Sequence, residues 1–298
     1  MKLLAASIGF FGLLSGCARG QPFDGTDART GGQDAAATDA PPSDAPSDED
    51  AQVTLDAPPP DASALLLSEV VLQPAGAEYI ELINPGSAPV DLSRYYLADH
   101  GNYFRIPAGT ATVDSSDFIV KFPQGASIPA HGVVTVAIDS AAAFTTTYGT
   151  APTFAIAGGT MMTIVSNGAP SLTNSGELVV LFYWDGSSDL VSDVDIMLAG
   201  TPSSINGIID KSGYSVDGPD AGNTPTAYAP DARTLAAQPS APGAGSSTKR
   251  IGLEAGEVQN GIGNGLTGDD ETTENTVVSW DTSYTAPTPG VVPAALQQ

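Results

Sequence analysis

The sequence has little of several residue types that functional sites commonly need. The 298-residue chain contains one cysteine and two histidines. One cysteine excludes an intramolecular disulfide and a thiolate metal cluster, and two histidines leave few ligands for a zinc site. Basic residues are also scarce, ten against 34 acidic residues, which gives a formal net charge of −24. Because nucleic-acid binding relies on clustered Lys and Arg that displace counterions from phosphate, nucleic acid is excluded as a partner.

The apolar run at the start of the chain is too short to cross a bilayer as a helix. It follows Lys2 and extends from Leu3 to Leu14, whereas a spanning helix needs roughly 20 residues. Such a run is typical of the hydrophobic region of a secretory signal peptide. The next residues, Leu14-Ser15-Gly16-Cys17, resemble the lipobox of bacterial lipoproteins. The resemblance implies that residues 1–16 are a lipoprotein signal peptide, cleaved after Gly16, and that Cys17 is the lipidation site; an ordinary signal peptide with a chance cysteine is the alternative.

Lipidation would fix the protein at a membrane. Each buried methylene of an acyl chain contributes about 0.8 kcal/mol, and two chains hold a protein stably where one holds it marginally. Residue 18 is Ala and not Asp, which by resemblance to enterobacterial sorting rules favours the outer membrane. We therefore expect a lipid-anchored protein of the bacterial cell envelope, at the outer membrane or cell surface.

Residues 17–62 have the composition of a disordered tether. They consist mainly of Asp, Ala, Pro, Ser and Gly, and they contain ten acidic residues against Arg19 and Arg29. Such a segment has too few apolar residues to form a core, and its like charges repel one another. Proline clusters such as 58–60 add polyproline II stiffness. The sequence predicts an extended spacer between the membrane and a folded body; a Pro-rich ligand for another domain is the alternative.

The folded body is predicted over residues 63–292, with a tail at 293–298. Gly and Pro number 33 and 24, which argues against long helices. Short runs of strand-forming residues recur between turn residues, which is typical of an all-β antiparallel sandwich. A stretch rich in Pro, Gly, Ser and Asp, about 190–246, predicts a long loop-rich insertion, and residues 140–147 predict a short helix or turn. The expected strands are 65–72, 78–84, 90–98, 117–122, 133–139, 161–165 and 177–184.

Several segments, taken in order, resemble the lamin-tail domain in its bacterial form. The first is a strand that ends in an Asn-Pro turn, and the second is a strand with a tyrosine pair. The resemblance is close over about 65–139 and loose over 247–290, and it implies an immunoglobulin-like β-sandwich of the kind found in secreted and surface proteins. The segments are Glu78–Gly86, Val90–Asp99, Phe104–Thr110, Ile128–Gly132, Ser247–Arg250, Trp280 and Thr288–Gly290.

The sequence contains no local catalytic motif. The chain has neither a G-x-S-x-G elbow nor an H-E-x-x-H helix motif. His100 and His131 both fall in expected turns, so we expect both to be exposed to solvent. We therefore predict no catalytic residue and no enzyme activity.

Acidic residues gather in two segments that could offer oxygen ligands to calcium. Calcium takes six to eight oxygen ligands, but neither segment has the D-x-[DN]-x-[DN]-G spacing. We expect solvated acidic loops, no metal and no cofactor, and keep calcium binding as an alternative. The segments hold Asp185, Asp189, Asp193 and Asp195, and Asp269, Asp270, Glu271 and Glu274 after the glycines of 260–265.

Aromatic and basic residues supply the remaining candidates. We expect Trp184 and Trp280 to lie in the core or at its rim. Three tyrosines could form an exposed patch for a partner. The one basic pair, Lys249-Arg250, is expected to pair with internal carboxylates. The three tyrosines are Tyr95, Tyr96 and Tyr103.

These expectations together favour a non-catalytic binding or scaffolding module. Its partners would be the membrane, through the N-terminal lipid, and an unidentified protein or polysaccharide. Two alternatives remain open: a calcium-dependent adhesion module, and an envelope hydrolase that uses loop carboxylates.

Overall fold

The computed structural model describes residues 65–200, 209–231, 238–252, 262–281 and 283–296, all within one compact unit, 54–298. The predicted signal peptide, Cys17 and the tether 17–62 lie outside the described residues. So do parts of the predicted insertion, at 201–208 and 232–237.

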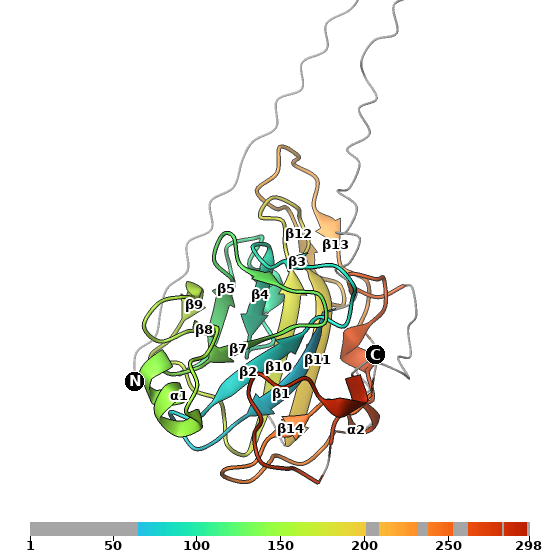
Figure 1. Cartoon of the computed structure of the whole chain (residues 1–298). Coiled ribbons are helices and arrows are strands. Elements are labelled where there is room, and N and C mark those ends of the chain that lie inside the picture. Colours follow the sequence, from blue (N-terminus) through green and yellow to red (C-terminus); the bar gives the residue numbers. More distant parts are fainter. Residues whose placement is uncertain (1–64, 201–208, 232–237, 253–261, 282, 297–298) are drawn as a thin grey trace, which may run out of the picture. The chain divides into compact units, whose positions relative to one another are not determined.

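Two five-stranded sheets form the body (Figure 1). Neighbouring strands within each sheet are antiparallel except for β7 and β8, which are parallel. The first sheet contains, in spatial order, β14 (Thr248–Lys249), β1 (Leu66–Val71), β2 (Tyr79–Ile83), β7 (Val133–Ala137) and β8 (Phe154–Ala155). The second contains β11 (Ser192–Gly200), β10 (Gly176–Tyr183), β4 (Tyr95–Ala98), β5 (Phe118–Lys121) and β9 (Met162–Ser166).

The main core lies between the two sheets. Successive side chains of a strand point to opposite faces, so Ile80 and Leu82 of β2 meet Val179 and Leu181 of β10 in one buried cluster. A second apolar cluster covers the outer face of the second sheet. Because both of its faces are covered, β10 is apolar along nearly its whole length rather than alternating.

Shorter elements close the ends of the sandwich. Two small ladders pair β3 (Val90–Asp91) with β6 (Ser127–Ile128), and β12 (Ser215–Val216) with β13 (Thr226–Ala227). The helical segments are η2 (Tyr103–Arg105), α1 (Ala141–Tyr148), η3 (Glu271–Thr273), α2 (Thr276–Ser279) and η4 (Ala294–Leu296). Among the described residues, none of these helices is long and apolar enough to span a membrane.

Local chemistry explains where α1 begins and ends. The Oγ of Ser140 accepts a hydrogen bond from the backbone N–H of Ala143, 3.2 Å away, which caps the first turn. Gly149 ends the helix with φ of 72°, a left-handed conformation that glycine adopts without a steric penalty. The prediction of a short helix or turn over 140–147 is confirmed.

The all-β sandwich is confirmed, with two differences in the strands. The expected strand 90–98 is divided into β3 and β4, because Asp91 accepts hydrogen bonds from the backbone N–H and the hydroxyl of Ser93 and so builds a turn. The expectation of loops from about residue 190 is wrong for 192–200. These residues form β11, the longest strand described, which pairs along its length with β10.

Candidate functional site

A bulge in β11 sends two aspartates to opposite faces of the second sheet. Phe182 of β10 pairs with Asp193 of β11, and the preceding residue, Leu181, pairs with Asp195. Val194 is therefore the extra residue of the bulge. A bulge of this kind re-aims the side chains on either side of it. Asp193 therefore lies on the outer face, and Asp195 lies between the sheets.

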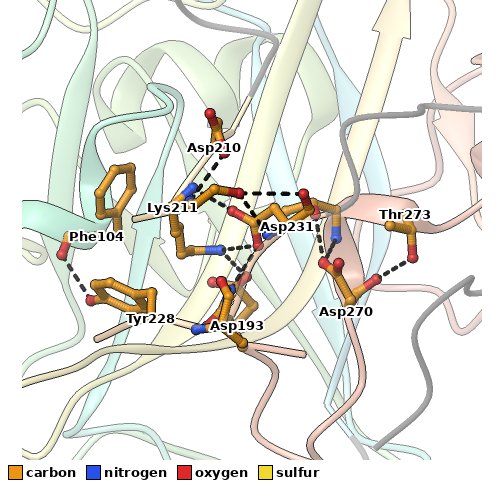
Figure 2. A network of polar contacts seen from close by, with 12 residues as sticks. Phe104, Asp193, Asp210, Lys211, Tyr228, Asp231, Asp270 and Thr273 are labelled. Atoms are coloured by element: carbon orange, nitrogen blue, oxygen red, sulfur yellow. Dashed lines mark hydrogen bonds and ion pairs between the residues drawn. The ribbon is translucent and has the colours of Figure 1, made fainter. Parts of the chain in front are cut away.

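On the outer face, Asp193 contacts a buried lysine (Figure 2). The Nζ of Lys211 lies 2.5 Å from Oδ2 of Asp193 and 3.6 Å from Oδ1 of Asp231. The side chains of all three residues have no exposed surface. The other oxygen of Asp231, Oδ2, accepts a hydrogen bond from the backbone N–H of Lys211 at 2.5 Å. One cation and two carboxyl groups thus share a site without solvent contact.

Two further side chains orient these carboxyl groups. The Tyr103 hydroxyl donates to Oδ1 of Asp193 at 2.5 Å, and the Nδ2 of Asn264 donates to Oδ1 of Asp231 at 2.7 Å. The lysine Nζ also lies 5.5 Å from the centre of the Tyr103 ring. Burial raises the pKa of Asp231, and the nearby lysine opposes that rise. We call Lys211, Asp193, Asp231, Asn264 and Tyr103 the Lys211 cluster.

Between the sheets, Asp195 contacts a buried arginine. A guanidinium nitrogen of Arg250 donates to Oδ1 of Asp195, and a second lies 3.5 Å from the Glu274 carboxylate. The Nε of Arg250 donates to the Leu67 carbonyl at 2.8 Å, and its guanidinium carbon lies 4.9 Å from the Trp280 ring centre. Burial raises the pKa of Glu274 to about 7 although the arginine opposes it. We call Arg250, Asp195 and Glu274 the Arg250 cluster.

A third group of carboxylates holds the C-terminal segment on the first sheet. Glu69 accepts hydrogen bonds from the Ser247 hydroxyl at 2.5 Å and from the Thr288 backbone N–H at 3.0 Å, and Lys249 lies 3.5 Å away. Its cross-strand neighbour Glu81 is fully buried, which raises its pKa to about 7. With the Arg250 cluster, this confirms the prediction that the basic pair binds internal carboxylates.

The two histidines differ in their environments. His131 is exposed in a turn, as predicted. The prediction for His100 is wrong, because only 1% of its surface is exposed. Its Nδ1 accepts a hydrogen bond from the backbone N–H of Asn102 at 3.0 Å, which satisfies one polar atom of the buried ring. Burial lowers the pKa of His100.

The predicted aromatic surface patch is also wrong. Tyr95 lies in the core between the sheets, and Tyr96 and Tyr103 lie in the outer cluster. Tyr96 stacks on Phe182 with ring centres 5.1 Å apart, so the tyrosine rings are packing residues. The prediction for the tryptophans is confirmed: Trp280 is fully buried and Trp184 is partly exposed at the edge of the outer cluster.

The expectation of solvated acidic loops is wrong for most of the residues that suggested calcium. Asp193, Asp195, Asp270, Glu271 and Glu274 are all buried. No sequence signal marked them as buried, because the basic residues that pair with Asp193 and Asp195 lie 18 and 55 positions away along the chain.

Among the residues that the structure describes, one group of carboxylates is more accessible. Oxygens of Asp189, Asp217 and Asp220 lie within 4.8 Å of one another, on half-buried and exposed positions. Asp189 already accepts hydrogen bonds from the Gly218 backbone N–H at 2.7 Å and the Thr226 hydroxyl at 2.5 Å. Within the described part of the chain, ligand atoms of two other groups lie equally close together: His100 with Asp114 and Asp117, and Asp195 with Glu271 and Glu274. The last of these contains the carboxylates that pair with Arg250.

Strand β9 forms one edge of the second sheet and exposes apolar side chains. Met162 is 52% exposed and Ile164 is 42% exposed. A strand at the edge of a sheet also presents unpaired backbone groups that another chain can join. The sequence predicts a strand here, but its pattern gives no sign that these apolar side chains are exposed.

The match to a protein-family model agrees with the fold. The family model of the Lamin Tail Domain matches residues 58–195. The sandwich is accordingly immunoglobulin-like, as the sequence resemblance implied. Among solved structures, a DUF4876 family protein from Bacteroides thetaiotaomicron is 13% identical with a TM-score of 0.36, over 78% of this chain and 72% of that chain. No curated protein matches the chain.

Proposed function

We propose that this protein is a non-catalytic binding module, anchored in a bacterial envelope by a lipid on Cys17 and held away from the membrane by the spacer 17–62. The observation that carries the binding role is the exposure of Met162 and Ile164 on the edge strand β9. The anchor is supported by the sequence Leu14-Ser15-Gly16-Cys17 and by the acidic, Pro-rich segment that follows it.

The placement of the charged groups supports a non-catalytic role. A general acid or base must reach its substrate within hydrogen-bond distance. In the described residues, the carboxylates of the Lys211 and Arg250 clusters contact internal cations and are buried. The hydrolase alternative must therefore depend on exposed groups such as Asp217 and Asp220.

The partner that fits β9 is an extended segment of another protein. Such a segment extends the sheet through backbone hydrogen bonds and places alternate side chains against the exposed surface. Met162 and Ile164 are both exposed on β9, and the register shift between Ile119 and Val120 makes Ile164 the extra residue of a bulge in this strand. A segment with apolar side chains that contact both exposed residues would cover this edge. Basic residues beside them would complement the net charge of −24.

A photocrosslinking residue placed in β9 tests this proposal on intact cells. With the photoreactive residue at Ile164, we expect a discrete crosslinked species. The matched control carries it at Ile262, which is 69% exposed but lies outside β9. The Met162→Lys substitution should remove the crosslink at 164. Equal crosslinking at 164 and 262, or a crosslink unaffected by the substitution, would contradict the proposal.

Cell fractionation tests the anchor separately. The Cys17→Ala variant should leave the membrane fraction, because it lacks the thiol that receives the lipid. Ser15→Ala is a suitable control, since it changes a neighbouring residue and retains the thiol. If Cys17→Ala still sediments with membranes, the lipobox interpretation is wrong.

A calcium-dependent adhesion module is the second candidate, favoured by the convergence of Asp189, Asp217 and Asp220. A ligand that binds only the folded state raises the midpoint of thermal unfolding. If this candidate is correct, calcium should raise the midpoint relative to chelator, and Asp217→Asn should weaken that response. Identical midpoints with calcium and with chelator would eliminate it.

A further inference from the structure

The Lys211 cluster brings an amine and a carboxyl group together with no surface exposed to solvent. Lysine and aspartate are almost never fully buried unless paired, and here both have no exposed surface and lie 2.5 Å apart. A second carboxyl group, on Asp231, lies 3.6 Å from the same nitrogen. The cluster therefore holds two carboxyl groups for one cation, more than a simple ion pair requires.

We propose that Lys211 and Asp193 condense into an intramolecular amide. The Nζ of Lys211 attacks Cγ of Asp193, an N–C bond forms, and the bond from Cγ to Oδ2 breaks. Two protons of the ammonium group end on Oδ2, which leaves as water, and one hydrogen stays on the amide nitrogen. The ion pair becomes a neutral amide and one water molecule, with no oxidant, reductant or other reactant.

The neighbouring side chains suit each stage of this reaction. Tyr103 donates a hydrogen bond to Oδ1 of Asp193, the oxygen that becomes the amide carbonyl. That bond stabilises the negative charge that develops on Oδ1 when the amine adds. Asp231 lies within reach of Nζ and is held by Asn264, so it can take a proton from nitrogen and return one to the leaving oxygen. Burial raises the pKa of Asp231, so its carboxylate takes up a proton more readily than an exposed aspartate does.

The side chains of Asp231 and Asn264 could also supply the acyl group of an amide with Lys211. Asp193 is favoured over both by distance and orientation. Its oxygen is 2.5 Å from the lysine Nζ, whereas that of Asp231 is 3.6 Å away. The Asn264 amide donates its hydrogens to Asp231 and to the Ala229 carbonyl. These contacts place Asn264 as a support for Asp231.

The amide would give the sandwich a covalent brace that its cysteine content cannot supply. The chain has one cysteine, so no disulfide can form within it. An amide from Lys211 to Asp193 joins β11 to a segment 18 positions further along the chain. A cross-link of this kind restricts the unfolded chain as a disulfide does. It would suit a module displayed outside the cell.

Peptide mapping of the purified full-length protein tests the proposal. Trypsin cleaves after free lysine, so an unmodified chain gives separate peptides 122–211 and 212–233. We expect instead one peptide, 122–233, lighter than its sequence mass by one water, with fragmentation that locates the loss between residues 193 and 211. Lys211→Arg should restore the full mass, and Asp231→Asn should do so while circular dichroism shows an intact β-sheet spectrum.

Three results would overturn the proposal. The wild-type chain could yield the two separate peptides at full mass, which would leave a buried ion pair only. The missing mass could equal one ammonia and involve Asn264, which would move the acyl group away from Asp193. Full cross-linking in folded Asp231→Asn would remove the proton-transfer role of that residue.

Discussion

Substituting Arg250 by methionine tests the energetic role of the Arg250 cluster. The substitution keeps a long apolar side chain but removes the cation that contacts Asp195 and Glu274. It also removes the hydrogen bond to the Leu67 carbonyl and the contact with the Trp280 ring. Two carboxyl groups would then remain buried between the sheets without this partner.

The expected loss of stability is large. Removing one partner of a buried ion pair costs about 3–5 kcal/mol, because the other charge stays buried. The free energy of unfolding of a typical domain is about 5–15 kcal/mol, so the variant should be close to its limit of stability. Replacing the Asp195 carboxylate by a neutral amide should recover part of this loss of stability. The double variant Arg250→Met with Asp195→Asn should therefore be more stable than Arg250→Met alone.

Urea denaturation at pH 7.5 of the wild-type chain, Arg250→Met, and Arg250→Met with Asp195→Asn measures these differences in the free energy of unfolding. Lys121→Met is the matched control, because it removes one positive charge from a partly exposed side chain 5.2 Å from the Tyr96 ring. That contact is worth about 0.5–1 kcal/mol at an exposed site. A loss for Arg250→Met no larger than that of the control, or a double variant less stable than the single one, would refute the reasoning.

Two other perturbations test a buried carboxyl group, that of Glu177, and the last residue of β11, Gly200. Burial raises the pKa of Glu177 from 4.5 to about 8, so the folded state holds a proton that the unfolded chain releases. That contribution to stability is fully present below pH 4.5 and is lost as the pH rises through about 8. The thermal midpoint should therefore fall between pH 5 and pH 8.5, and less steeply in Glu177→Gln; equal slopes would contradict this. Gly200→Ala should lower the free energy of unfolding by roughly 3 kcal/mol or more, because the new Cβ would lie 2.3 Å from the Ser175 carbonyl oxygen at a φ of +77°. Gly158→Ala, with a φ of +90° but open space around the Cβ, should cost only about 1–2 kcal/mol, and similar losses for both variants would show that the close contact is unimportant.

The strands were predictable because their patterns are local. Residues 133–137 alternate between faces and are bounded by turn residues, which is enough to indicate β7. Strand β11 was missed because its sequence, SDVDIMLAG, places two aspartates in a buried strand. Each of those charges has a cation partner distant in the sequence, and only the folded chain shows the pairing.

The candidate sites were less predictable than the fold for the same reason. Lys211 lies in a stretch whose composition indicates a loop, and nothing near it in the sequence suggests burial. His100 follows an aspartate in a turn, which usually means exposure, yet a backbone N–H satisfies its ring nitrogen inside the protein. Burial of a polar residue depends on partners from other segments, so residue type and neighbours along the chain give little guidance.

The mass of the N-terminal peptide of the membrane-bound protein tests the proposed role most directly. The account predicts a mature chain that begins at Cys17 and carries acyl chains on that residue. A mature protein whose first peptide retains residues before Cys17, or starts at Cys17 without a lipid, would contradict the anchor and with it the proposed display of the sandwich at the envelope.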